Sequence, residues 1–376
     1  NIDHPDIEEF INWKVHEEQK VGALVTGSRL QAKHLNLVVS ACHSSELPGD
    51  QRFDVHHNKA LRKALLDGRA VGVVDNYLVR AIEFAKQGFT EIDFPEYTTD
   101  WDSEGYATVA GQNSNNSVRV TDDFMDAVLR NESWNLIRRT EGEVHSTVRA
   151  DSLWSDICYS AWACADPGLQ FDTTINDWHT CPEGGRINGS NPCSEYMFLD
   201  DTACNLASLN LMHFYNMDDS SFRIDDLRHA IHIWTTVLEI SVDMAQYPSK
   251  KIARLSVDYR TLGLGFANIG AVLMVQGHPY DSPEGRGIAG ALSAILTGES
   301  YAQSARIASE LGAFVKYEEN KEHMLRVIRN HRRAAYDAPS NEYESLHINP
   351  VGLNMKNIPA DLLSAAQGAW DTALSL

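Results

Sequence analysis

Residues 190–211 read SNPCSEYMFLDDTACNLASLNL, and the fold of the chain is interpreted outward from this stretch. Within it, Asn191, Cys193 and Glu195 alternate with a proline and a serine. Side chains two positions apart lie on the same side of an extended segment, so we expect an amide, a thiol and a carboxylate to face a common substrate. Pro192 limits the flexibility of the tip because its ring fixes φ and removes one backbone donor.

These three groups suit radical chemistry on an alcohol. A thiol can give its hydrogen atom to an external radical, and the resulting thiyl can take a hydrogen atom from carbon. The carboxylate of Glu195 can accept a hydroxyl proton, and the amide of Asn191 can orient a neighbouring hydroxyl. The spacing alone also fits a second interpretation, in which Cys193 is a buried thiol beside a turn and the other two side chains are local caps.

A second cysteine, Cys204, follows Cys193 by 11 positions. Residues 199–202 between them have the composition of a turn, so a strand–turn–strand path would bring Cys204 back toward Cys193. Considered alone, a cysteine within the apolar residues 203–207 also fits a place in the core.

Composition and charge exclude several classes of protein. The chain has 376 residues, of which 43% are hydrophobic, enough for one large domain or two ordinary ones. A formal net charge of −20 disfavours nucleic-acid binding, although N–H groups at a helix start can hold one small phosphate. No apolar run approaches the roughly 18 residues of a membrane helix and no N-terminal signal is seen, so we expect a soluble, cytoplasmic protein without a membrane partner.

Metal binding is not predicted. Six cysteines are too sparse for a disulfide framework, and no pair has the C-x-x-C spacing of a closed zinc site. His229 and His232 stand one helical turn apart, but no carboxylate pattern completes a site, so we expect them at the surface. His179 and Cys181, near Asp177, have the donor types of a metal pair, although packing within the loop is the favoured interpretation.

Hydrophobic periodicity predicts an α/β chain with long helices around fewer strands. Helices are expected over residues 5–20, 28–42, 58–67, 76–88, 122–130 after a Thr121 cap, 150–165, 225–246, 261–276, 283–311, 319–332 and 359–373, with a hairpin over 138–148. Gly263, Gly265 and Gly270 partly resemble a dinucleotide fingerprint. No predicted strand precedes them and the third glycine is misplaced, so they indicate helix packing instead.

Both ends of the sequence look cut. The chain begins at Asn1 rather than at a methionine and enters a helical pattern almost at once. It ends within a second helical pattern, over residues 370–374. We therefore expect a fragment of a longer protein.

Residues 190–211 resemble the finger loop of the ribonucleotide reductases. The 11-residue step from Cys193 to Cys204 and the proline after Asn191 are similar to the class II, adenosylcobalamin-dependent branch in its long bacterial form. The resemblance spans essentially all 376 residues, and is weakest over residues 21–110. Further stretches that carry it are residues 3–10, 115–122 and 260–265.

The resemblance implies a ten-stranded α/β barrel of the ribonucleotide reductase and glycyl-radical type, with the finger loop threaded through its centre. Residues 1–376 would be an incomplete portion of one catalytic barrel domain with long surrounding helices, and residues 21–110 a family-specific insertion. The effector loop and the second reducing cysteine would precede Asn1, and the phosphate-binding segment and last strands would follow Leu376. The fragment alone is therefore expected to be inactive.

The resemblance also implies a reaction, the reduction of ribonucleotides to 2′-deoxyribonucleotides. Adenosylcobalamin would form a radical that takes hydrogen from Cys193, whose thiyl would abstract the ribose 3′ hydrogen. Glu195 would take the 3′-hydroxyl proton, and Asn191 would hydrogen-bond the ribose hydroxyls. The 2′-hydroxyl would leave as water, and Cys204 would be one of two thiols that supply electrons and form a disulfide bond. The substrate-binding residues would be Asn191, Pro192, Cys193, Ser194 and Glu195.

The partners that the resemblance implies are a ribonucleoside di- or triphosphate and a dithiol reductant such as thioredoxin. dNTP or ATP effectors would bind outside residues 1–376, and a second copy would form a homodimer. Two alternatives stay open. The cut ends also fit a non-catalytic fragment or assembly partner of a split reductase, and a related glycyl-radical enzyme would use the same barrel, although residues 191–195 favour cobalamin.

Overall fold

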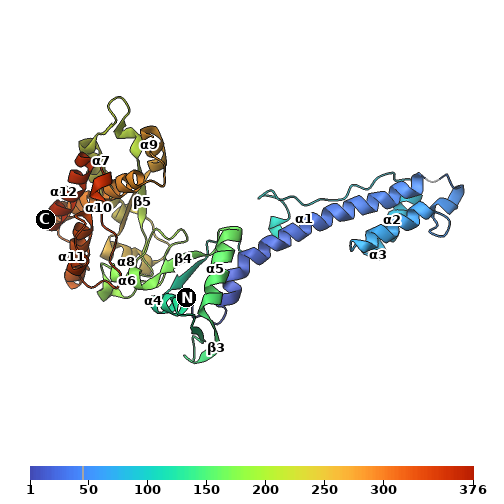
Figure 1. The fold of residues 1–376 in the computed structure, drawn as a ribbon, viewed down its shortest axis with the longest axis horizontal. Coiled ribbons are helices and arrows are strands. Elements are labelled where there is room, and N and C mark those ends of the chain that lie inside the picture. The colour runs from blue at the N-terminus through green and yellow to red at the C-terminus, as the bar shows by residue number, and fades with distance from the viewer. Residues whose placement is uncertain (45) are drawn as a thin grey trace. The chain divides into compact units, whose positions relative to one another are not determined.

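A computed structural model describes residues 1–44 and 46–376 of the chain (Figure 1). These residues form two compact units. The first unit comprises Asn1–Val118 and Asp126–Gly168, and the second comprises Arg119–Met125 and Leu169–Leu376. Two short strands, β1 (Ser117–Val120) and β4 (Gly168–Phe171), pair with each other.

One helix of 37 residues, α1 (Ile7–His43), dominates the first unit (Figure 1). It joins the two helices predicted over residues 5–20 and 28–42, so the predicted break between them is wrong. The chain stays helical through Gly22 and Gly27. A glycine costs a helix only about 1 kcal/mol relative to alanine, and the buried side chains on both sides of the pair offset that cost.

Two further helices, α2 (Lys59–Ala70) and α3 (Asp75–Lys86), pack against the end of α1. Asn58 caps α2 because its Oδ1 accepts the Leu61 N–H at 3.0 Å. Both helices lie where the sequence predicted them. The shared core contains Leu35, Val38, Val39, Cys42, Leu61, Ala64, Leu78, Ala81 and Ile82.

A hairpin is formed as predicted, but it begins at Ser133, before the predicted residues 138–148. Strands β2 (Ser133–Ile137) and β3 (Val144–Arg149) pair antiparallel, with Ser133 opposite Arg149. The predicted Thr121 cap is also confirmed, because its Oγ1 accepts the Phe124 N–H at 3.3 Å. The remaining elements between residues 44 and 168 are η1 (Gly49–Phe53), η2 (Tyr106–Thr108), α4 (Asp122–Leu129) and α5 (Ala150–Cys164).

The second unit is built mainly from helices. Its core lies where α10 and α12 pack together and against α7, and includes Ile231, Ile288, Leu292, Ile295, Leu362 and Ala366. The helices are α6 (Asp172–Asp177), α7 (Ile224–Met244), α8 (Lys250–Tyr259), α9 (Ile269–Gln276), α10 (Pro283–Leu311), α11 (Tyr317–Ala335) and α12 (Ala360–Ser375). Short 3-10 turns are η3 (Pro182–Gly184), η4 (Leu211–His213), η5 (Ser340–Glu342) and η6 (Met355–Asn357).

A parallel strand pair at the heart of this unit corrects one prediction. Strand β5 (Asn205–Asn210) pairs in parallel with β8 (Leu262–Ala267), with Asn205 opposite Leu262. The predicted helix over residues 261–276 is therefore wrong in its first half, and Gly263 and Gly265 lie in a strand rather than at a helix contact. Glycine disfavours a helix, and the exposed edge of β5 offers this segment backbone partners instead.

The mixture of helices and strands confirms the α/β class. Across residues 1–44 and 46–376 the strands form two-stranded pairings only, the last of them β6 (Tyr215–Asn216) with β7 (Ser221–Phe222). A closed ten-stranded barrel is not formed within the described chain, so it stays a prediction. No helix of the described residues is long and apolar enough to cross a membrane.

Candidate active site

The loop that precedes β5 makes a tight turn at residues 191–194. The Ser194 N–H donates to the Asn191 C=O at 3.0 Å, which places Pro192 and Cys193 at the two central positions. Proline suits the first of these because its φ is fixed near the value that the turn requires. Ser194 has a left-handed φ of 65°, a conformation that costs a non-glycine residue about 1–2 kcal/mol and needs support from its surroundings.

This turn replaces the extended segment predicted for residues 191–195. The alternation of an extended strand therefore does not decide where the side chains of Asn191, Cys193 and Glu195 lie. The prediction that residues 191–195 are extended is wrong. Cys193 and Glu195 are exposed, whereas Asn191 is half-buried. The interpretation of Cys193 as a buried thiol is wrong too, since the residue lies where a molecule outside the loop can reach it.

Two polar side chains brace the loop after the turn. Asn191 accepts the Tyr196 N–H on its Oδ1 at 3.0 Å. The hydroxyl of Tyr196 lies 2.8 Å from the Oγ1 atoms of both Thr202 and Thr261, and burial raises its pKa. Thr261 directly precedes β8, so the phenol ties the loop to the strand pair.

Cys204 occupies a different environment at the start of β5. It is half-buried, and the residue before it is fixed at both backbone atoms: the Ala203 N–H donates to Ser256 Oγ at 3.0 Å, and its C=O accepts from Thr261 Oγ1 at 3.0 Å. Burial raises the pKa of the Cys204 thiol to about 11, and the negative charge of Glu195 adds to the shift. The structure therefore brings Glu195 within electrostatic reach of Cys204.

The sulfur of Cys204 lies close to β8 where residue 263 is a glycine. A Cβ atom at Gly263 would lie 2.7 Å from Cys204 Sγ and 2.4 Å from Leu206 Cδ2. Both distances are too short for non-bonded atoms. None of the six cysteines, all of which lie in the described residues, is joined in a disulfide.

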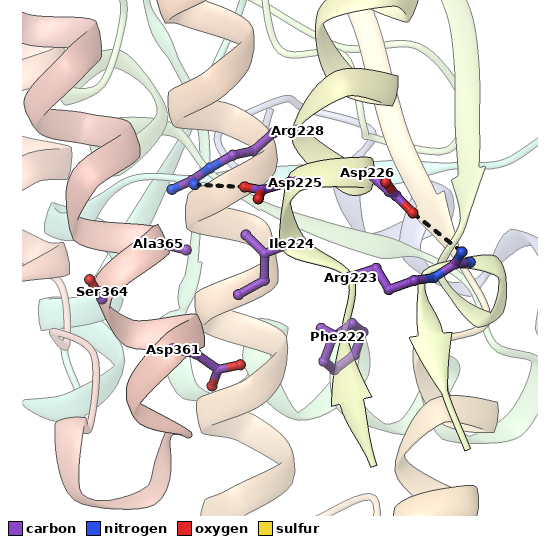
Figure 2. A pocket seen from close by; sticks show the side chains of 9 residues that line it. All are labelled: Phe222, Arg223, Ile224, Asp225, Asp226, Arg228, Asp361, Ser364 and Ala365. Atoms are coloured by element: carbon purple, nitrogen blue, oxygen red, sulfur yellow. Dashed lines mark ion pairs between the residues drawn. The ribbon is translucent and has the colours of Figure 1, made fainter. Parts of the chain in front are cut away.

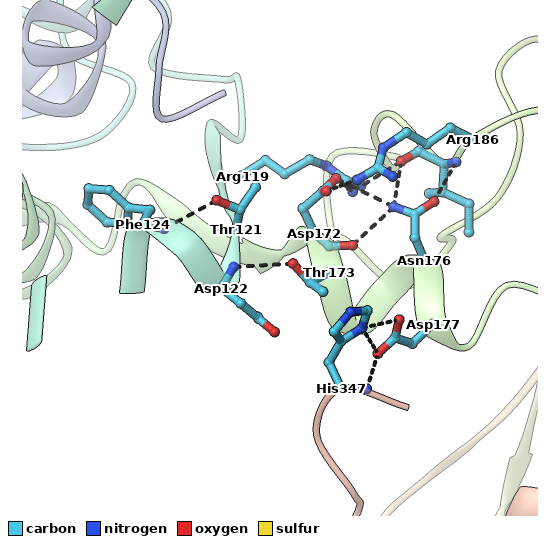
Figure 3. A network of polar contacts seen from close by, with 11 residues as sticks. Arg119, Thr121, Asp122, Phe124, Asp172, Thr173, Asn176, Asp177, Arg186 and His347 are labelled. Carbon is cyan, nitrogen blue, oxygen red and sulfur yellow. Dashed lines mark hydrogen bonds and ion pairs between the residues drawn. The ribbon is translucent and has the colours of Figure 1, made fainter. Parts of the chain in front are cut away.

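A buried ion-pair network holds the segment that leads into the loop (Figure 3). Arg119, on β1, is 6% exposed and donates from Nη1 to Asp172 Oδ1 at 2.8 Å and to the Ile187 C=O at 3.2 Å. Arg186 pairs with the other oxygen of Asp172. Asn176 donates to the same carbonyl at 3.2 Å and accepts the Ile187 N–H at 3.1 Å, so residues 186–187 are fixed to α6.

Sequence reasoning missed Arg119, Asp172 and Gly263. The arginine and the aspartate are 53 positions apart, and no local pattern links them. Gly263 lies within residues 260–265, which the family resemblance singled out, and a glycine in a strand often marks the close approach of another segment, as Cys204 approaches here.

The histidines considered as metal ligands contact other groups of the protein. His179 accepts the Cys181 N–H on Nδ1 at 3.2 Å and contacts the Gly185 C=O from Nε2 at 3.0 Å, and burial lowers its pKa. This neutral ring packs the loop, as the favoured interpretation held. His229 is exposed, whereas His232 lies 2.8 Å from the buried carboxylate of Glu299. The described part of the chain contains no cluster of three potential metal ligands.

A cavity of about 530 Å³ opens at the starts of α7 and α12 (Figure 2). Its two arginines are already paired, Arg223 with Asp226 at 3.3 Å and Arg228 with Asp225 at 3.5 Å. The cavity therefore offers no uncompensated positive charge to a phosphate, and no residue of the loop lines it. Its lining is Phe222, Arg223, Ile224, Asp225, Asp226, Arg228, Asp361, Ser364 and Ala365.

Comparison with known proteins identifies relatives of the whole chain. The chain is 58% identical over 377 residues to the vitamin B12-dependent ribonucleotide reductase of Bradyrhizobium diazoefficiens, and 56% identical over 377 residues to that of Agrobacterium fabrum. Each comparison covers 100% of this chain and 30% of the relative. A reductase of the same name from Streptomyces avermitilis is 37% identical over 379 residues, covering 100% of this chain and 31% of the relative.

These relatives are much longer than the chain, which spans about 30% of their length. A family model described as "Ribonucleotide reductase, barrel domain" matches residues 1–349. The match takes in the turn with Cys193, the start of β5 with Cys204, and the β5–β8 pair. The chain belongs to the ribonucleotide reductase barrel-domain family.

Proposed function

We propose that the chain carries the radical-bearing loop of an adenosylcobalamin-dependent enzyme that reduces ribonucleotides to 2′-deoxyribonucleotides. One observation carries this function: the exposed Cys193 at the centre of a braced turn, next to a carboxylate that is within electrostatic reach of Cys204. Family membership supports the reaction, and the vitamin B12-dependent names of the relatives support the cofactor.

Adenosylcobalamin, when bound, supplies the organic radical that removes a hydrogen atom from a thiol. An exposed thiol fits this role because hydrogen-atom transfer requires the two atoms to be in contact. Cys193 meets that requirement, whereas Cys204 is half-buried against β8. We therefore assign the radical to Cys193.

The thiyl of Cys193 takes the hydrogen atom from C3′ of the ribose, so that an S–H bond forms as the C–H bond breaks. Glu195 accepts the proton of the 3′-hydroxyl, and the 2′-hydroxyl takes a proton from a thiol of the reducing pair and leaves as water. Two thiols supply two hydrogen equivalents and become a disulfide. Glu195 then returns its proton to the 3′ oxygen and Cys193 returns its hydrogen atom to C3′, which restores the thiyl and completes the cycle.

Cys204 is assigned as one of the two reducing thiols. Its pKa of about 11 keeps the sulfur protonated near neutral pH, which suits a group that must deliver hydrogen. Asn191 already accepts a backbone N–H on its Oδ1. The amide hydrogens are therefore the part of Asn191 that would bond to a ribose hydroxyl, while the backbone of Pro192 and Ser194 shapes the turn around the sugar.

The wider assembly follows from the family. The strands of this chain would join others in a ten-stranded barrel around the loop, with residues 21–110 as an insertion that contains α2 and α3. The substrate would be a ribonucleoside di- or triphosphate, and a dithiol such as thioredoxin would regenerate the cysteine pair. Nucleotide effectors and a second copy of the chain complete the expected partners.

A Cys193→Ser variant tests this function. It should abolish deoxyribonucleotide formation, measured by chromatography of the product nucleotides, in the full-length protein that carries this chain, supplied with adenosylcobalamin and a dithiol. A serine O–H bond is too strong for the cofactor radical to break, so we expect a loss of at least about 1,000-fold.

Cys158→Ser is the matched control. Cys158 is also an exposed cysteine, but it lies on α5 in the first unit, and its replacement should leave the activity unchanged. Substantial activity in Cys193→Ser would overturn the assignment. Activity that does not require cobalamin would instead favour a glycyl-radical mechanism.

A further inference from the structure

A glutamine from β4 connects the two ends of the Cys193 turn. Gln170 is 6% exposed, and its Nε2 donates to Ser190 Oγ at 2.7 Å and to Ser194 Oγ at 2.9 Å. Ser190 directly precedes the turn, and Ser194 is its last residue. One buried nitrogen thus binds both ends of the turn, although Ser190 and Ser194 lie 20 and 24 residues after Gln170 in the sequence.

The two serines pass this restraint to the backbone of the turn. Ser190 Oγ donates to the Asn191 C=O at 2.7 Å and lies 3.3 Å from Ser194 Oγ. The same Asn191 carbonyl accepts the Ser194 N–H that closes the turn. These contacts stabilise the left-handed conformation of Ser194, and we call Gln170 with the two serines the glutamine clasp.

The clasp is anchored on a rigid base. Two residues after Gln170, Asp172 starts α6 and binds the buried Arg119. On the loop side, Ile187 is fixed by Arg119 and Asn176, only three residues before Ser190. Gln170 therefore spans two segments that the ion-pair network already holds in place.

Glutamine is well suited to this position. Its amide nitrogen carries two hydrogens, so a single side chain can donate to two oxygens at once. A glutamate would place acceptors against both serine oxygens, and a methionine would keep the length of the side chain without either donor. The two hydrogen bonds, rather than the buried volume, distinguish glutamine here.

We propose that Gln170 is a positioning residue for Cys193, one that fixes the direction of the thiol without touching the reacting atoms. This role rests on the proposed function, because it matters only if Cys193 must meet a cofactor and a sugar in turn. Radical transfer at both steps depends on contact geometry, and an error of about 1 Å in such geometry can cost on the order of 100-fold in rate.

A Gln170→Met variant tests the role in the full-length protein. We expect turnover to fall by about tenfold or more while KM for the nucleotide stays within about twofold, since the groups that bind substrate are retained. Hydrogen exchange at the peptide that contains the Ser194 N–H should become faster, because the turn loses its support. Gln303→Met is the matched control: Gln303 donates to Thr236 Oγ1 at 3.2 Å, between α10 and α7.

A double-mutant cycle separates positioning from general destabilisation. The pair Ser190→Ala and Ser194→Ala removes the acceptors without changing the buried glutamine, and should reproduce the loss of turnover. Adding Gln170→Met to that pair should then cost less than about twofold more, since all three side chains act as one unit. Additive losses, or a Gln170→Met protein with unchanged exchange and turnover, would overturn the role of the clasp.

The outcomes also distinguish this role from the proposed function. If Cys193→Ser retains activity while Gln170→Met still speeds exchange in the turn, the clasp supports the turn, but the radical assignment fails and the positioning role fails with it. If Cys193→Ser is inactive and Gln170→Met behaves like Gln303→Met, the radical assignment stands and the clasp fails.

Discussion

The two cysteines of the candidate site lie only 11 positions apart, yet their surroundings differ in kind. Cys193 is exposed on a turn that is held from behind by serines and a buried glutamine. Cys204 is half-buried at the start of a parallel strand pair, with its sulfur against a glycine of β8. Hydrogen bonds to Ser190 and Ser194 hold the turn that carries Cys193. The sulfur of Cys204 is instead restricted by close packing against β8.

This difference matches the two roles proposed for the cysteines. A radical-bearing thiol has to meet first a cofactor and then a substrate, which requires access and a fixed direction. A reducing thiol has to keep its proton until it is needed, and burial provides that by raising its pKa. Glu195 connects the two cysteines electrostatically. It directly follows the turn that contains Cys193, and its negative charge contributes to the raised pKa of Cys204.

The largest effect expected from the difference in burial is the slow reaction of Cys204 with alkylating reagents. With a pKa of about 11 against an ordinary value of 9.0, its thiolate fraction near pH 8 is about 100-fold smaller than that of an ordinary cysteine. The rate with iodoacetamide should rise about tenfold per pH unit until the pH nears 11, as followed by mass spectrometry of the Cys204 peptide. A rate that levels off near pH 9 would show that burial does not raise the pKa of Cys204.

A Gly263→Ala substitution should disturb the close packing around Cys204. The added Cβ would overlap Cys204 Sγ and Leu206 Cδ2, so we expect a destabilisation of about 1–3 kcal/mol, measured by urea unfolding. Gly265→Ala is the control in the same strand, because its Cβ would lie 3.6 Å from Ser208 Oγ, an ordinary contact. Equal effects of the two substitutions would show that the space beside Cys204 is not specially restricted.

The sequence predicted the elements whose signals are local. The bounds predicted for α10, Pro283 to Leu311, are confirmed: Ser282 Oγ accepts the Gly285 N–H at its start, and Gly312, with φ 89°, follows its last residue. The cap at Thr121 is also a local signal and is confirmed, whereas the hairpin was predicted over residues 138–148 and its first strand, β2, lies before that range. The resemblance, rather than periodicity, identified the stretch that contains Cys193 and Cys204.

The errors occur where distant contacts decide the local structure. Strand β8 was predicted to be helical because only its pairing with β5, more than 50 residues earlier, makes it extended. The turn at residues 191–194 was predicted to be extended because alternation ignores the hydrogen bonds to Gln170 that stabilise a left-handed serine. Gln170 could not be identified from the sequence, because a single glutamine in a short strand gives no indication that it binds Ser190 and Ser194.

The smallest expected effect concerns the charge that connects the two cysteines. Glu195→Gln removes the negative charge near Cys204 and should lower the pKa of that thiol, so its alkylation at fixed pH should become faster. The gain should stay below about tenfold, since burial is the larger cause of the raised pKa and remains in the variant. Asp200→Asn, which removes an exposed carboxylate bound to Asn188 in the same loop, should leave the rate unchanged. If both variants leave it unchanged, Glu195 acts on the turn alone and the two thiols are electrostatically independent.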